Sequence, residues 1–139
     1  MEVQEKKIGR VFRMRLTKGD DFFEEINKFV VKQGIKDASI FIVGALGEGQ
    51  MVTGFTKEGD LDRHELGEKR EFFGIGPLSR PDKRPHAVPE TVEWNQPKPY
   101  AHIHLALGPD LGKAYTETLV GHLEHASTIG AFIDIYELL

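Results

Sequence analysis

Two histidines near residue 100 have the residue type and spacing of metal ligands. His102 and His104 lie two residues apart in YAHIHLAL, residues 100–107, where the histidines alternate with the apolar residues Ala101, Ile103 and Leu105. Alternate side chains of a strand share a face, so this spacing places both imidazoles on one side of a predicted strand. Two such rings can bind one ion at roughly 2.0–2.1 Å per bond. The alternative is a pair of exposed histidines on a solvated sheet face.

His122 is the third candidate ligand. If GPDLG, residues 108–112, forms a turn, a strand over residues 115–123 runs back beside the strand over 100–107. Facing side chains of antiparallel neighbours lie roughly 5 Å apart, so His122 can reach the same face. Gly121 next to it permits close approach of a backbone or ligand.

Three histidines with an open fourth position form the arrangement of reactive zinc sites, although iron, nickel and copper are chemically possible. The chain has no cysteine, so a metal must bind to His, Asp or Glu. Glu65, Glu117 and Glu124 are candidates to orient a ligand or to act as a general base, and no spacing singles one out. We expect the remaining nearby histidines, His64, His86 and His125, to lie on the surface.

Composition limits the possible functions. The net charge of −4 over 139 residues argues against a dedicated nucleic-acid binder, which needs a local excess of cations. One such local excess of cations exists near the start of the chain, in Lys6, Lys7, Arg10, Arg13 and Arg15. These side chains either cover a solvated strand face or contact an anion or DNA. We expect no membrane span, no secretory signal and a cytoplasmic location.

The positioning elements follow from the hydrophobic pattern. We expect one main helix, capped by Asp20 or Asp21 and ended by Gly34. We expect strands over residues 11–16, 38–46, 50–56, 63–75, 100–107, 115–123 and 128–138. The glycines between residues 44 and 49 predict a turn between antiparallel strands. This is an α+β domain with a mainly antiparallel sheet.

A proline-rich loop is predicted over residues 77–99, which contain six of the seven prolines. Proline cannot donate to a sheet ladder or continue a helix. Long loops inside compact domains are often functional, and this one could bring Trp94 or His86 near the histidines. The length of the chain fits a single domain over residues 1–139.

Several segments together resemble one known family. FRMRLTKGDDFFEEINKFVVKQGIKDASI is similar to the opening of the plants and prokaryotes conserved (PPC) domain. The later segments IVGALGEGQMVTGF, HIHLAL and VGHLEHASTIGAFIDIYEL resemble its subsequent motifs, so the match spans residues 10–138. The resemblance implies an antiparallel-sheet fold, a homotrimer, and a metal, usually zinc, on His102, His104 and His122.

Two departures from the family pattern matter. The chain lacks the AT-hook that precedes the domain in plant nuclear proteins, and the segment 77–99 is longer than the usual connection. Three functions remain open: a metal-bearing regulatory or DNA-binding module, a zinc-type hydrolase or lyase acting on a small molecule, and a metal that only stabilises the fold or an interface. Serine or cysteine nucleophile chemistry lacks support.

Overall fold

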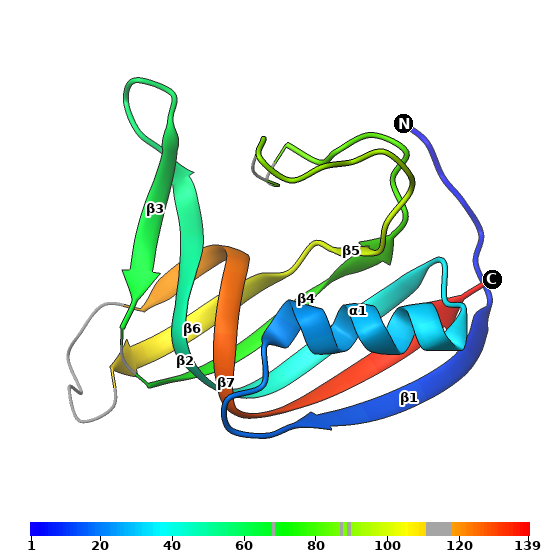
Figure 1. Cartoon of the computed structure of the whole chain (residues 1–139), viewed down its shortest axis with the longest axis horizontal. Helices are drawn as coiled ribbons and strands as arrows, with labels where there is room; N and C mark the ends of the chain where they lie inside the picture. The colour runs from blue at the N-terminus through cyan, green and yellow to red at the C-terminus, as the bar shows by residue number, and fades with distance from the viewer. Residues whose placement is uncertain (68, 87, 89, 111–117) are drawn as a thin grey trace.

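Antiparallel strands make up most of the computed structural model (Figure 1). The structure describes residues 1–67, 69–86, 88, 90–110 and 118–139. The elements in chain order are β1 (Ile8–Leu16), α1 (Phe22–Gln33), β2 (Ala38–Phe55), β3 (Leu61–Leu66), β4 (Arg70–Ser79), β5 (Tyr100–Ala101), β6 (His104–Asp110) and β7 (Leu119–Leu138). Among these residues, no helix is long and apolar enough to cross a membrane.

The strand pairings close on themselves. The order β1-β7-β6-β4-β2-β3 is joined by a further pairing between β7 and β2, so β2, β4, β6 and β7 each pair with two of the others. The pairings between the described strands are all antiparallel. The predicted fold class is confirmed: one compact domain with a mainly antiparallel sheet and one short helix.

Helix α1 begins and ends where its capping residues predict. The Asp21 carboxylate accepts a hydrogen bond from the backbone N–H of Glu24 at 2.8 Å, and Gly34 takes the left-handed conformation at φ 68°. Phe22, Ile26 and Val30 form its buried face. Figure 1 shows the helix lying across the sheet, which it covers on one side.

The sequence interpretation of the glycines at residues 44–49 as a turn is wrong. β2 runs through them as one strand of 18 residues, and β7 is likewise one strand of 20 residues where two were predicted. The register between β2 and β7 shifts at Ala45/Leu46 and at Leu46/Gly49. The glycines therefore allow bulges and close contact between backbones within one long strand. In the sequence, such glycines have the same pattern as the glycines of a turn.

Three other predicted boundaries also differ. Residues 63–75 form parts of two strands, because β3 ends at Leu66 and β4 begins at Arg70. β4 continues through Pro77 to Ser79, so the start of the predicted loop belongs to a strand, and the next strand, β5, begins at Tyr100. The predicted turn at 108–112 starts inside β6, which continues to Asp110, and residues 111–117 lie outside the described part of the chain.

One face of the sheet carries exposed apolar side chains. Along β2, Ile40 and Ile42 point into the core, whereas Phe41 and Val43 between them are 48% and 57% exposed. Their paired neighbours on the same face are also exposed and apolar: Phe73, Ile75 and Phe132. We call these five residues the open apolar face. Such a contiguous patch is unusual for a protein that stays monomeric.

Candidate metal centre

His102 and His104 lie at a break between two strands. β5 ends at Ala101 and β6 begins at His104, so the continuous strand predicted over 100–107 is interrupted. Alternation nevertheless persists, because Ala101, Ile103 and Leu105 are 3%, 0% and 3% exposed and belong to the core. The two histidines therefore lie on the opposite side, as their spacing predicts.

Glycines on the neighbouring strands allow the close approach that positions these histidines. A Cβ on Gly76 would lie 1.8 Å from the carbonyl oxygen of His102, so only glycine fits there. The N–H of His102 donates to the carbonyl of Pro77 at 2.9 Å. Gly121 has the same role beside His122, since a Cβ there would lie 2.1 Å from the carbonyl oxygen of Val52.

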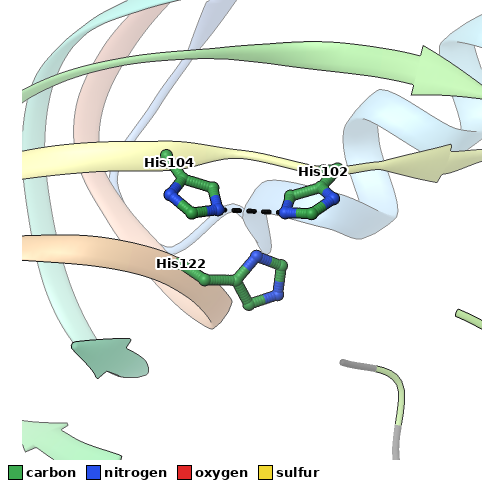
Figure 2. Close-up of side chains that lie close together, drawn as sticks. All are labelled: His102, His104 and His122. Carbon is green, nitrogen blue, oxygen red and sulfur yellow. Dashed lines mark hydrogen bonds between the residues drawn. The ribbon is translucent and has the colours of Figure 1, made fainter. Parts of the chain in front are cut away.

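His122 comes to the pair from β7. It is the direct antiparallel partner of His104, as the predicted return of the chain requires. Figure 2 shows the three rings converging, with one ring nitrogen of His122 facing the other two rings. The ring centroids of His102 and His122 are 4.8 Å apart, and those of His104 and His122 are 5.6 Å apart. The structure thus brings the three predicted histidines into one cluster.

The cluster has the dimensions of a metal site. The Nε2 atoms of His102 and His104 are 3.0 Å apart. Two nitrogens bound to one tetrahedral zinc lie roughly 3.3 Å apart, given bonds of roughly 2.0–2.1 Å. One ligand atom from each histidine lies within 4.8 Å of the others, so a small side-chain rotation brings all three to bonding distance. The cluster could therefore hold a metal ion.

The buried Nδ1 atom of His122 has no hydrogen-bond partner among the described residues. A mutual hydrogen bond can explain the short distance between His102 and His104, but it leaves this third nitrogen unsatisfied, at a cost of about 1–3 kcal/mol. Burial, followed by the neighbouring charges of His102 and His104, lowers the pKa of His122 to about 4. His122 is therefore neutral at pH 7, which is the form that binds metals.

A cavity of about 520 Å³ opens over the cluster and is lined by all three histidines. His86 from the long loop also lines it, as the loop hypothesis anticipated. Trp94 instead lines a second cavity of about 300 Å³, on the side of His122 that also borders helix α1. A metal on the cluster would thus face an accessible space.

The three candidate glutamates have different environments. Glu124 lines the second cavity with His122, and its carboxylate pairs with the guanidinium of Arg63 at 3.2 Å. Glu65 accepts a hydrogen bond from the side chain of Gln50 and is not among the residues lining the cavity over the cluster. Glu117 lies outside the described residues.

Tyr100 is a residue of the site that the sequence analysis missed. It lines both cavities, and its ring centroid lies 5.7 Å from that of His102. Burial, and then the charge of Glu124, raises the pKa of its phenol. The signal was available in the alternation of YAHIH, because Tyr100 precedes His102 by two residues.

Much of the basic stretch near the N-terminus is engaged in ion pairs. Lys6 pairs with Asp37 at 2.8 Å, Arg10 with Glu137 at 2.7 Å and Arg13 with Asp134 at 2.6 Å. The guanidinium of Arg15 lies 5.8 Å from the ring centroid of Phe132. Partnered cations are partly neutralised, which reduces what this stretch offers to a phosphate backbone.

Fold and site together define a small antiparallel-sheet domain with a three-histidine cluster suited to a divalent metal. The model of the Plants and Prokaryotes Conserved (PCC) domain matches residues 3–136. The chain belongs to this family, as the sequence resemblance indicated. A comparison with curated proteins finds no match.

Solved structures share the fold. A metal-containing protein from Archaeoglobus fulgidus matches with a TM-score of 0.78 and 27% identity over 99% of this chain and 86% of that one. A plant- and prokaryote-conserved protein from Pyrococcus horikoshii has a TM-score of 0.78 over 100% and 85%, and its 23% identity shows the fold alone. A candidate DNA-binding protein from Bacteroides thetaiotaomicron has a TM-score of 0.67 and 25% identity over 95% and 80%.

Proposed function

We propose that this protein binds one divalent metal ion per chain, zinc in the first instance, through His102, His104 and His122. The observation that carries this proposal is the buried Nδ1 of His122, which lacks a hydrogen-bond partner and belongs to the same cluster as the two Nε2 atoms 3.0 Å apart. A metal satisfies this nitrogen, whereas a hydrogen-bonded pair of histidines does not. The description of the Archaeoglobus relative as metal-containing supports the same assignment.

Metal analysis with a matched histidine control tests the proposal. The full chain, stripped with a chelator and titrated with zinc by calorimetry, should bind one ion per chain. His122→Ala should lower the affinity at least 100-fold, because one of three ligands is lost. His125→Ala is the control, since His125 is exposed on the same strand and outside the cluster. Equal zinc binding by the two variants would exclude the site.

Among the described residues no fourth ligand joins the cluster, and a position left open to the cavity would distinguish this metal from a purely structural one. Three histidines supply three of the four ligands of a tetrahedral zinc, and structural zinc sites are closed by a fourth protein ligand. The cavity over the cluster favours a second candidate function, a zinc-type hydrolase or lyase acting on a small molecule. Turnover that requires metal and is lost in His104→Ala would support it, and unchanged turnover in the metal-free protein would exclude it.

The open apolar face supports self-association. We propose that copies of this chain cover it in a homotrimer, because five exposed apolar side chains share one side of the sheet. Val43→Asp on this face should convert the trimer to a monomer by light scattering. Val31→Asp, on helix α1 and with the same 57% exposure, should leave it intact. A monomeric wild-type protein would refute the proposal.

DNA binding is a third candidate, favoured by the description of the Bacteroides relative. The net charge of −4 and the ion pairs of Lys6, Arg10 and Arg13 weaken it for this chain. Affinity for duplex DNA measured at rising salt concentration decides the matter, since phosphate contacts lose affinity steeply with salt. No binding at low salt would exclude this function.

A further inference from the structure

The cavity over the histidine cluster has apolar walls. Its lining includes no Asp, Glu, Lys or Arg among the described residues. Apart from the cluster, its polar groups come from Thr53, His86 and the phenol of Tyr100. Besides the ring of Tyr100, five apolar residues line it with their side chains: Val52, Phe55, Leu61, Pro85 and Val120. A cavity of about 520 Å³ is of the size that small organic ligands occupy.

Two described carboxylates near the cavity, those of Asp62 and Glu124, already have partners. The Oδ2 atom of Asp62 accepts a hydrogen bond from Thr53 at 3.1 Å and lies 3.3 Å from Nε2 of His64. Glu124, two residues after His122, pairs with Arg63. Neither carboxylate lines the cavity, so neither supplies negative charge inside it.

The charge balance of the loaded site therefore favours an anion. Three neutral imidazoles leave the two positive charges of a divalent ion uncompensated. The apolar walls strengthen this effect, because an unpaired charge is costly in surroundings of low polarity. An oxygen anion in the open position would relieve it, and no lysine or arginine in the described part of the chain lines the cavity to bind the anion elsewhere.

The side chains at the mouth of the cavity indicate the chemistry of the part of the ligand that does not bind the metal. Phe55 on β2 and Val120 on β7 are 69% and 62% exposed. They come from two neighbouring strands, because Val52 of β2 pairs with His122, and β7 carries both His122 and Val120. An apolar group that reaches from the metal position to these side chains would bury surface that is now exposed to water.

We infer that the open metal position takes a small monocarboxylate with an apolar body, such as an aryl or branched alkyl acid. The carboxylate would occupy the coordination position, and the body would lie against Phe55 and Val120. The inference rests on the metal-binding function proposed above. It adds the chemical class of the molecule that this site binds.

Titrations of the cobalt-loaded full chain test the inference, because the visible bands of Co²⁺ change when a ligand joins its coordination shell. The probes are benzoate, acetate, which lacks the ring, and benzyl alcohol, which lacks the charge. We expect benzoate to bind at least tenfold more tightly than acetate, from burial of the ring. Benzyl alcohol should bind more weakly than benzoate by at least the same factor.

Two variants localise the apolar contact. Phe55→Ala should bring the affinity for benzoate toward that for acetate while leaving the affinities for Co²⁺ and acetate unchanged. Val120→Glu should weaken benzoate binding at least tenfold, and the control Val31→Glu on helix α1 should not. The control separates a local effect of the added charge from a general effect on the protein.

The outcomes separate this inference from the metal proposal. Failure of Co²⁺ to bind overturns both. Normal Co²⁺ binding with equal affinities for benzoate and acetate, or with a ratio unchanged in Phe55→Ala, overturns the inference alone. Binding of benzyl alcohol as tight as that of benzoate also overturns it, because the anion would then be unnecessary.

Discussion

Replacing Gly76 with alanine tests how His102 is positioned. A Cβ at this residue would lie 1.8 Å from the carbonyl oxygen of His102 and 3.0 Å from the Cα of Ile103. Real Cβ contacts below 3.0 Å are essentially absent, so the two chain segments must separate by more than 1 Å. Both colliding groups belong to the backbone, and no side-chain rotation can relieve the overlap.

We expect Gly76→Ala to lower the free energy of unfolding by about 2–3 kcal/mol, the upper part of the range of about 1–3 kcal/mol for an overpacked interior, because both colliding groups belong to the backbone. For a domain of this size the corresponding decrease in Tm is about 6–12 °C. Zinc affinity should fall at least tenfold, because metal–ligand distances tolerate only about 0.2 Å of error and His102 moves with its backbone. Thermal unfolding of the metal-free protein and competition with a chromophoric chelator measure the two effects.

Gly67→Ala is the matched control. A Cβ at Gly67 meets no atom of the described residues within 4 Å, and Gly67 does not have the positive φ that would strain alanine. We expect Tm and zinc affinity close to those of the wild type. A Gly76→Ala variant as stable as Gly67→Ala, or one that loses stability yet binds zinc with unchanged affinity, would refute this role of Gly76.

The cap of helix α1, the ion pair of Glu137 and the proposed zinc site can each be tested in the same way. Asp21→Ala removes the acceptor for the N–H of Glu24 and should cost about 1 kcal/mol, seen as a lower midpoint in urea. A hydrogen bond and the charge of Arg10 hold the pKa of Glu137 below its ordinary value of 4.5. The pair therefore stabilises the folded state at neutral pH, and the difference in Tm between wild type and Glu137→Gln should shrink below about pH 4; a constant difference would contradict this. Zinc at 100 times its Kd stabilises by about 2.7 kcal/mol, so EDTA should lower the Tm of the zinc-loaded protein but not that of His122→Ala.

The helix and the histidine cluster were predictable because local rules decide them. Asp21, Gly34 and the apolar spacing of α1 act within a few residues of chain, and the structure agrees with each. The shared side of His102 and His104 depends only on the alternation of buried and exposed residues. The pairing of His104 with His122 needed one further assumption, the return of the chain, and β6 and β7 satisfy it.

The glycines misled the prediction for a physical reason. Only glycine fits at residues 44 and 49, because the backbone of β7 lies close to both. A Cβ on Gly49, for example, would lie 2.4 Å from the carbonyl oxygen of His125. A sequence contains no information about which distant backbone lies beside a glycine, so a bulged strand and a turn look alike. For the same reason the sequence did not predict the role of Gly76, because its contact with His102 joins residues 26 positions apart.

The three histidines differ in how firmly the backbone places them, and under the proposed metal binding this would affect which metal the site prefers. His104, the first residue of β6, pairs directly with His122 of β7, so this strand pairing fixes the separation of their backbones. His102 lies outside regular strand, held by its hydrogen bond to Pro77 and by its packing on Gly76. A change from tetrahedral to a flatter coordination must move at least one ligand, and His102 is the one whose backbone is least constrained. Selectivity among divalent metals should therefore depend on the contact between Gly76 and His102 more than on the paired strands.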